Sequence, residues 1–408
     1  MQNKYINLLL DKCISLEKSK ILFIHYNEEI EDFIKSLTKQ AKKLGVEEIY
    51  LDKININQDY EILKTHTIKE LEQNDFFNCS IWDEFAKKNA SFLIFETEQP
   101  HIMDDIEPEK LAIMAKKRRE SRPIYRKMVE HCELSWCIAA YPGEKWAKEI
   151  FPNSSNSYLE LENAIYKMCL IDTPNPQESW DIQLTKNAKI IKYLNSLNLK
   201  KLHYQNSLGT NLELYLPINY SFESAKDNAV IVNMPSYEIF ASPIYNKTKG
   251  IVYSSMPLCY NGSIVDEFWL KFENGKVIDY GAKIGLEILK GIIESDSNSC
   301  YLGECALVEN NSPISNLGLV FQTTLIDENA SCHLALGSGF PECIKNGINM
   351  TDKELLENGI NVSKTHVDFM IGTKDLNITG TTYDNKEIPI FIDGNYSNNI
   401  IENNYNAN

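Results

Sequence analysis

Several features that mark common functional classes are missing from this sequence. No apolar segment is followed by a GxGxxG or GxxxxGK[ST] stretch, so the glycine backbone that cradles a phosphate in nucleotide-binding folds is absent. None of the ten cysteines forms a CxxC pair, and no histidine spacing typical of a zinc finger accompanies them. The sequence therefore indicates neither a nucleotide-binding enzyme nor a zinc-finger protein.

Positive charge and long apolar runs are also scarce. The 41 Lys and Arg residues are outnumbered by 57 Asp and Glu residues, and the net charge of -16 argues against nucleic acid as a main partner. No apolar run reaches the length of a membrane span, and the first residues contain no small-residue cleavage site. We therefore expect a soluble cytoplasmic protein with buried, reduced thiols, and neither nucleic acid nor a membrane as its partner.

The first half of the chain alternates between strands and helices. The 408 residues are enough for two domains, each with its own core. Strands are expected at 20–26, 47–52, 92–97 and 136–142, and helices at 30–45 and 107–132, the second one broken at Pro123. This alternation is typical of an open, mostly parallel sheet. We predict an α/β N-terminal open-sheet domain over residues 1–198, which ends in a helix at 178–198.

The second half is richer in short strands. Asn274-Gly275 lies between two of them and is a strong hairpin signal. One helix is expected at 284–295. We predict a β-rich α+β C-terminal catalytic domain over residues 199–396, followed by an Asn-rich tail at 397–408 that we expect to be flexible.

One histidine and one aspartate share a strand-like segment near the end of this domain. His366 and Asp368 lie two residues apart, so the period of a strand puts both on one face and Val367 and Phe369 on the other. Side chains at this spacing start about 6.5–7 Å apart, which is close enough to share a metal ion or a pair of ions. Taken alone, a His-x-Asp pair is a weak signal, because ordinary surface strands contain it often.

The stretch DENASCH, residues 327–333, joins a carboxylate pair to a second histidine. If a helix starts near Asp327, that carboxylate caps it, and His333 is then an ordinary buried histidine. By itself the stretch favours this structural interpretation over a metal site.

Glu238 and Glu304 stand among apolar and small residues, where a lone carboxylate is costly unless it is paired or ligated. Together with the two histidine segments they make four segments with potential metal ligands in one domain. Exposure to solvent could excuse one of these carboxylates, but it explains all four segments poorly. Two histidines and three or four carboxylates, without a cysteine ligand, suit zinc, cobalt, manganese or magnesium. A site of this kind can hold two ions about 3.5–4 Å apart and activate a bridging water.

These segments, taken together, resemble one known family. The stretches NMPSYEIFASP (233–243), LGECALV to SGFP (302–341) and NVSKTHVDF to FIDGNY (361–396) are similar in order and spacing to the thermophilic-type dinuclear metalloaminopeptidases, the family of aminopeptidase T, aminopeptidase S and PepS. In the first half, WCIAAYP followed by WA is similar to the same family. The resemblance covers nearly the whole chain, and the joint pattern is far more specific than any single stretch.

The resemblance implies a cytoplasmic, homodimeric metalloaminopeptidase that hydrolyses N-terminal residues from peptides with a metal-activated water. It also implies two divalent metal ions per subunit, which would be zinc, cobalt or manganese. By position, the implied metal ligands are Glu238, Glu304, His333, His366 and Asp368, with Glu328 as a further ligand or the partner of one. In this hypothesis Glu304 is also catalytic, because it helps to take the proton of the attacking water.

One position departs from the family pattern. The family's catalytic tyrosine is matched by Phe340, which keeps the ring but lacks the hydroxyl that can donate to an oxyanion. Loss of one such donor costs on the order of 10²–10³ in turnover. Tyr237 is a candidate substitute, but as the neighbour of Glu238 on a strand it would point to the opposite face.

Phe340 therefore keeps a second hypothesis open, namely a catalytically weakened metal-binding homodimer with a binding or scaffold role. The intact set of matched ligands favours the enzyme over this alternative. A metallophosphoesterase is a third hypothesis, but it is disfavoured because the Asp, Asn and His signatures of that class are missing.

Overall fold

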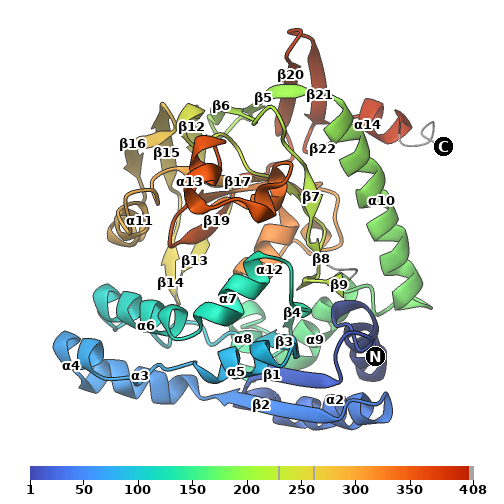
Figure 1. Cartoon of the computed structure of the whole chain (residues 1–408), viewed down its shortest axis with the longest axis vertical. Coiled ribbons are helices and arrows are strands. Elements are labelled where there is room, and N and C mark those ends of the chain that lie inside the picture. Colours follow the sequence, from blue (N-terminus) through green and yellow to red (C-terminus); the bar gives the residue numbers. More distant parts are fainter. Residues whose placement is uncertain (228–229, 261, 404–408) are drawn as a thin grey trace. The chain divides into compact units, whose positions relative to one another are not determined.

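The computed structural model describes residues 1–227, 230–260 and 262–403, which divide into two compact units (Figure 1). The first unit contains Met1–Trp180, Lys226–Pro235 and Asn261–Ser263, and the second contains Asp181–Ala225, Ser236–Tyr260 and the residues from Ile264 onwards. A short segment of the second half of the chain thus belongs to the first unit. The predicted domain boundaries at residues 198 and 396 stay predictions.

The first unit is built on a five-stranded sheet in the order β10-β4-β3-β1-β2. Its strands are β1 Ile21–Asn27, β2 Glu48–Ile54, β3 Ser91–Glu96, β4 Trp136–Ala140 and β10 Asn233–Met234. Every neighbouring pair is parallel, which confirms the predicted parallel sheet. We expected β10 in the β-rich half instead, because a segment of two residues carries no local signal for the partner that it will join.

Helices cover both faces of this sheet, as a parallel sheet requires. The helices of this unit are α1 Gln2–Leu8, α2 Glu31–Lys43, α3 Ile56–Thr65, α4 Ile68–Gln73, α5 Ile81–Lys87, α6 Pro108–Glu120, α7 Pro123–Glu130, α8 Glu144–Ile150 and α9 Ser157–Met168. Of these, α3, α4 and α6 pack against one another in a separate apolar cluster. Phe23 packs against Trp82 of α5 on one face, with ring centroids 5.0 Å apart. Phe95 packs against Phe33 of α2 on the other, at 5.3 Å. The predicted break at Pro123 is confirmed, since α7 begins there.

The second unit contains two antiparallel sheets, which confirms the β-rich second half. The smaller sheet has the order β19-β18-β17-β11-β7, and the larger has the order β16-β15-β12-β6-β5-β20-β21-β22. Strands of the smaller sheet are β7 Glu223–Ser224, β11 Ile239–Ala241, β17 Leu302–Leu307, β18 His333–Gly337 and β19 His366–Met370. Strands of the larger sheet are β5 Leu199–Gln205, β6 Asn211–Tyr215, β12 Lys249–Tyr253, β15 Trp269–Glu273, β16 Lys276–Gly281, β20 Asn377–Thr382, β21 Glu387–Ile392 and β22 Asn395–Tyr396. Two further strand pairs are β13 Leu258–Tyr260 with β14 Ser263–Val265 and, in the first unit, β8 Lys226–Asp227 with β9 Val230–Ile231.

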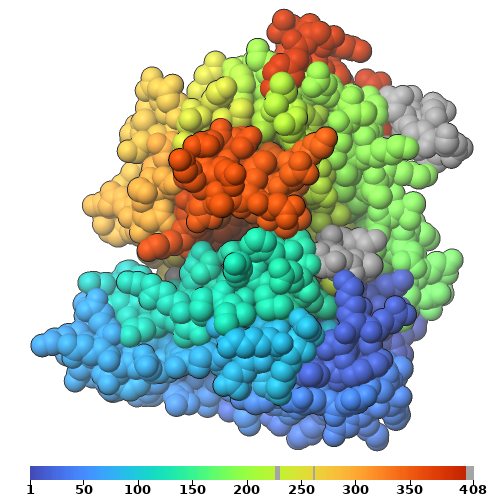
Figure 2. Space-filling view, in the orientation of Figure 1, coloured from blue at the N-terminus to red at the C-terminus, as the bar shows by residue number. Residues whose placement is uncertain are grey.

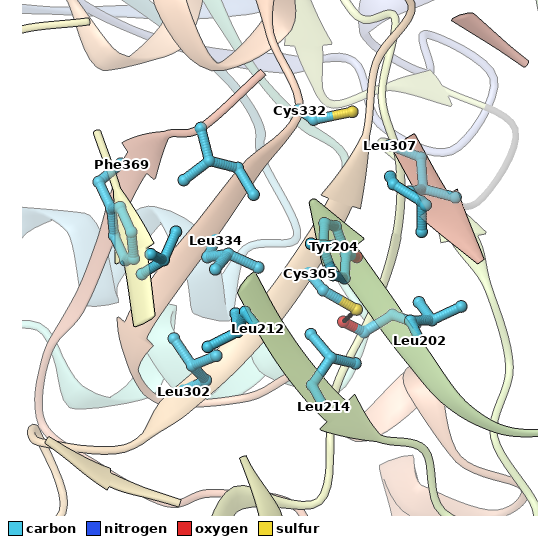
Figure 3. Close-up of a cluster of buried hydrophobic side chains, with 14 of the residues drawn as sticks. Leu202, Tyr204, Leu212, Leu214, Leu302, Cys305, Leu307, Cys332, Leu334 and Phe369 are labelled. Carbon is cyan, nitrogen blue, oxygen red and sulfur yellow. Dashed lines mark hydrogen bonds between the residues drawn. The ribbon is translucent and has the colours of Figure 1, made fainter. Parts of the chain in front are cut away.

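An apolar core joins the two sheets of the second unit (Figure 3). The larger sheet contributes buried side chains from β5 and β6, and the smaller sheet contributes them from β17, β18 and β19; among them are Leu202, Tyr204, Leu212, Leu214, Leu302, Cys305, Leu307, Leu334 and Phe369. Because successive strand residues point to opposite faces, the smaller sheet has a second face that turns away from this core. That second face holds the polar residues described below.

Thiols in this protein are mainly packing residues. Seven of the ten cysteines are buried and form no disulfide, as expected for reduced thiols, namely Cys13, Cys137, Cys169, Cys300, Cys305, Cys332 and Cys343. Three of them, Cys300, Cys305 and Cys332, belong to the core of the second unit. There they behave as small apolar side chains.

The connections of the second unit match several local predictions. Asn274 and Gly275 join β15 to β16 with φ angles of 50° and 79°, which confirms the hairpin. The expected helices are α10 Pro176–Ser196 and α11 Leu286–Ile293, and shorter ones are α12 Thr324–Asp327 and α13 Asp352–Glu357. The turn between β20 and β21 is exposed at residues 383–387, and this hairpin projects in red in Figure 2.

The C-terminal tail differs in part from our expectation of a flexible segment. It contains helix α14 Asn398–Asn403, and Ile400 is fully buried in the core of the second unit. Burial of this apolar side chain outweighs the weak helix propensity of asparagine. Residues 404–408 lie outside the described part of the chain. Within the described part, no helix is both long enough and apolar enough to cross a bilayer.

Candidate metal centre

Five of the predicted site residues converge on the second face of the smaller sheet. Glu238 directly precedes β11, Glu304 lies on β17, His333 begins β18, and His366 and Asp368 lie on β19. These strands are neighbours in the order β19-β18-β17-β11. His366 and Asp368 share one face while Val367 and Phe369 enter the core, which confirms the period-two prediction for this strand.

A small residue lies at the centre of the arrangement. Ala335 of β18 is paired with Glu304 on one side and with Asp368 on the other. The two carboxylates therefore stand in one row across three strands, with only a methyl group between them. A larger side chain at position 335 would occupy the volume that the carboxylates face.

Glu304 reaches this face because β17 contains a bulge. Leu302 lies two residues earlier and would share the face of Glu304 in a regular strand, yet Leu302 belongs to the core between the sheets. The register of β17 against β18 shifts between these two residues, which inverts the side-chain alternation. A Cβ atom on Gly303 would lie 2.1 Å from the carbonyl oxygen of Ser338. The bulge therefore needs glycine at this position.

One group of potential ligands is closed off from solvent. It comprises Glu238, Glu304 and His333, whose ligand atoms all lie within 4.8 Å of one another. His333 Nε2 lies 3.2 Å from Glu238 Oε2 and 3.9 Å from Glu304 Oε1. The side chains are only 1% exposed for the histidine, 7% for Glu238 and 4% for Glu304. We call this the inner group.

The second group shares Glu304 and is more open. His366 Nε2 lies 3.0 Å from Glu304 Oε2 and 3.2 Å from Asp368 Oδ1. The side chain of His366 is 26% exposed, so solvent reaches this group. We call it the outer group. Glu304 contributes Oε1 to the inner group and Oε2 to the outer one, which is the geometry of a carboxylate that bridges two cations.

Backbone carbonyls orient both imidazoles. His333 Nδ1 lies 3.0 Å from the oxygen of Ser331, and His366 Nδ1 lies 2.7 Å from the oxygen of Ser338. A carbonyl oxygen can only accept, so each Nδ1 carries the proton and a neutral ring turns its Nε2 lone pair toward the carboxylates. Two acceptors repel each other at these distances unless a proton or a cation lies between them.

The charges of the cluster lead to the same conclusion. Even with both histidines protonated, three buried carboxylates would leave one negative charge without a partner, which is costly in a buried site. Divalent cations would remove this cost, and imidazole nitrogens with carboxylate oxygens suit zinc, cobalt and manganese. The residues of both groups therefore fit metal ions.

The pKa values reflect this mutual dependence. Burial alone would lower the pKa of His333, but its hydrogen bond with Glu238 and the charge of Glu304 raise it to about 9. Burial raises the pKa of Glu304 to about 7 against the opposing effect of His366. Burial would also raise the pKa of Asp368, but the charge of His366 lowers it to about 2. His333 and Asp368 thus each hold their charge through an opposite charge beside them, whereas burial dominates at Glu304.

Phe340 lies beside the outer group. Its ring centroid is 4.9 Å from that of His366 and 5.0 Å from that of Phe240. Its backbone N–H donates to the hydroxyl of Ser242 at 2.8 Å, which holds the residue in place. The side chain next to His366 is therefore an aromatic ring that carries no hydroxyl group.

Other predicted residues lie around the site. Glu328 is buried in a short turn and belongs to neither group, so its role as a ligand or partner stays a prediction. Asp327 ends α12, and its carboxylate accepts the N–H of Phe321 at 2.8 Å. The interpretation of Asp327 as the cap of a following helix is wrong, because Asp327 directly precedes the 3-10 helix Glu328–Ala330 but its side chain makes no cap hydrogen bond there. Tyr237 donates its backbone N–H to Asn329 Oδ1 at 2.6 Å, and its role as an oxyanion donor stays a prediction.

Sequence reasoning missed the residues that support the ligands. Ser331 and Ser338 act through backbone carbonyls, which any residue type supplies, so no side-chain signal exists for them. Gly303 and Ala335 act through their small size. The only available hint was the run of small residues after His333.

Comparisons with known proteins show which family the chain belongs to. The family described as thermophilic metalloprotease (M29) matches residues 1–396 of the chain. The chain belongs to this family. It is similar to aminopeptidase AmpS of Bacillus subtilis (strain 168), with 32% identity over 406 residues, 97% of this chain and 98% of that protein. It is also similar to aminopeptidase PepS of Streptococcus thermophilus, with 31% identity over 401 residues, 96% of this chain and 97% of that protein.

A solved structure shares the fold of this M29 chain. Wild-type AmpT from Thermus thermophilus matches it with a TM-score of 0.87 at 24% identity, over 97% of this chain and 98% of that one. The likeness confirms the predicted fold class, a mixed α/β protein with one parallel sheet and antiparallel sheets. Membership of a metalloprotease family confirms a metal-dependent hydrolase.

Proposed function

We propose that this chain is a metal-dependent aminopeptidase that removes N-terminal residues from peptides. The observation that carries the proposal is the pair of ligand groups that share Glu304, one oxygen to each group. The similarity to AmpS and PepS, both aminopeptidases, supports the choice of peptides as substrates. The donor set supports divalent metal as the cofactor.

Two ions of zinc, cobalt or manganese would bind, one to Glu238, Glu304 and His333 and the other to Glu304, His366 and Asp368. When bound, such ions supply a water whose pKa is lowered toward neutrality. Glu304 is the one carboxylate that belongs to both groups, so it would be near a proton released between them. We assign it the role of receiving that proton as well as bridging.

The outer group is the place where substrate would enter, because His366 is the exposed histidine of the pair. Phe340 and Phe240 would line the entering residue with apolar surface. We further propose a homodimer in the cytoplasm. That part of the proposal rests on the family resemblance alone.

The alternative of a weakened enzyme that serves as a binding or scaffold protein depends on Phe340. Burial of a complete set of polar ligands costs folding free energy. A functional role in catalysis explains why the chain keeps them, so this observation favours the enzyme.

Glu304→Gln tests the proposal directly. The amide keeps the shape but loses the charge, the bridging oxygen and the proton acceptor, so hydrolysis of aminoacyl p-nitroanilides in added cobalt, zinc or manganese should become undetectable while the fold persists. Glu273→Gln is a matched control on β15, where the side chain is exposed, and should keep full activity. Undiminished turnover in Glu304→Gln would remove this residue from the mechanism, and an unsubstituted protein that binds metal but hydrolyses no peptide bond would favour the scaffold.

A further inference from the structure

We propose that Asn361 is a positioning residue that aims the imidazole of His366 into the outer group. The inference extends the proposed function, because it concerns one of the two ligand groups. The proposal concerns the orientation of the protein's own side chains, so it can be tested without added metal ions or substrate.

Asn361 lies in the loop that leads into β19 and is only 1% exposed. Its side-chain Nδ2 donates to the carbonyl oxygen of Gly337 at 2.5 Å and to that of Asn298 at 2.9 Å. Its backbone carbonyl oxygen accepts the N–H of Gly339 at 2.8 Å. Asn361 therefore bonds to the residue before Ser338 and to the residue after it.

Ser338 is the residue that orients the exposed histidine. Its carbonyl oxygen accepts Nδ1–H of His366 at 2.7 Å, and its N–H donates to the oxygen of Thr365 at 2.7 Å. The Gly339 N–H lies in the same peptide plane as the Ser338 carbonyl and is bonded to the Asn361 backbone. The Asn361 side chain holds the preceding peptide plane through the oxygen of Gly337. Asn361 therefore restrains the backbone on both sides of Ser338. The direction of His366 Nε2 toward Glu304 and Asp368 follows from the plane of the Ser338 carbonyl.

Glycines allow this tight arrangement. Gly337 has a φ of 105°, and a Cβ atom there would lie 2.2 Å from the oxygen of Thr365. A Cβ atom on Gly339 would lie 3.0 Å from the Ser242 hydroxyl oxygen. The segment of residues 337–339 therefore lies in close backbone contact with the entry to β19, and Asn361 holds it there.

The inner group has a separate anchor. His333 Nδ1 is held by the oxygen of Ser331, at the opposite end of β18 from Ser338. Loss of the Asn361 side chain should therefore disturb the outer group selectively. A purely structural role in the loop would instead affect both groups alike, through general loss of stability.

The test compares two substitutions of Asn361 with one matched control. Asn361→Ala removes the side chain, and Asn361→Asp keeps its shape but removes the donor to Gly337. Asn298→Ala is the control, because Asn298 Nδ2 donates to Val362 O at 2.8 Å in the same loop, and that bond involves neither Ser338 nor its neighbours. All three variants lose hydrogen bonds of the same loop.

The first readout is the histidine spectrum of protein without added metal. With ¹⁵N-labelled histidine, the Nδ1–H signal of His366 should shift or broaden in Asn361→Asp, whereas that of His333 should stay, and both should stay in Asn298→Ala. The second readout is cobalt binding followed by absorption and elemental analysis. The weaker cobalt equivalent should lose roughly tenfold or more in affinity in both Asn361 variants, with the tighter one unchanged.

An unchanged His366 signal in Asn361→Asp would overturn the inference, and so would equal losses of cobalt from both positions. If the spectra and cobalt binding behave as expected but the unsubstituted protein cleaves no peptide, then the aminopeptidase proposal fails and the positioning role stands. The two proposals can therefore fail separately.

Discussion

At the residue scale, the most informative position is the one where a hydroxyl is missing. The ring centroid of Phe340 lies 4.9 Å from that of His366, so a hydroxyl at the para position of the ring would be close to the outer group. A donor in such a place stabilises the negative charge that develops on the attacked carbonyl oxygen.

We expect Phe340→Tyr to raise turnover of aminoacyl p-nitroanilides by roughly 10²-fold, with a smaller change in KM, because the gain belongs to the transition state. Phe240→Tyr is the control, since its ring belongs to the same apolar cluster and is buried. Unchanged turnover in Phe340→Tyr would mean that another group already donates to the oxyanion, and Tyr237 would then be the next residue to substitute.

At the scale of single elements, the bulge in β17 decides which face receives Glu304. Cys305 and Leu307 alternate regularly into the core after the bulge, and Leu302 enters the same core before it. Glycine at position 303 permits this inversion of the side-chain alternation, because β17 approaches the backbone of Ser338 closely there. The position of the bridging carboxylate therefore depends on a residue that has no side chain.

Gly303→Ala should lower the free energy of unfolding by about 1–3 kcal/mol, because the added methyl group meets backbone atoms that cannot move aside. Chemical denaturation measures the loss, and metal content measures the damage to the site. Gly291→Ala in α11 is the control, because nothing lies within 4 Å of its added methyl group, and there we expect a gain of about 0.5–1 kcal/mol. A tolerated alanine at 303 with full metal content would show that the bulge does not depend on glycine.

At the scale of the whole molecule, the ligand groups connect four strands of the second unit. Without ions, carboxylates of β17, β19 and the segment before β11 repel one another in a buried place. Ions that bind only the folded chain add stability by mass action, about 2.7 kcal/mol for one site at 100 times its Kd.

Removal of metal by a chelator should therefore lower the melting temperature, and metal added back should restore it. Amide hydrogen exchange locates the effect, with faster exchange expected in β17, β18 and β19 and unchanged exchange in β1 to β4 of the first unit. Equal loss of protection in both units would contradict a stabilising role confined to this site.

Local sequence patterns determined much of this protein. Alternating apolar strands and helices predicted the parallel sheet, Asn274-Gly275 predicted a hairpin, and the period of a strand put His366 and Asp368 on one face. These features depend on residues that are close along the chain, so local propensity and side-chain alternation suffice to predict them. The five converging residues stood out by their local context, but their joint role as ligands came from the resemblance, because nothing in their separate segments tells how they meet.

Only the tertiary structure decided which strands became neighbours and in what register. The pairing of Ala335 with Glu304 and Asp368, the bulge at Gly303 and the hydrogen bond of Asn361 with Gly337 all join residues from separate segments of the chain. Such contacts depend on how closely two segments approach and on backbone groups, and backbone groups are chemically the same in every sequence. Their positions are therefore set by the packing of the whole domain.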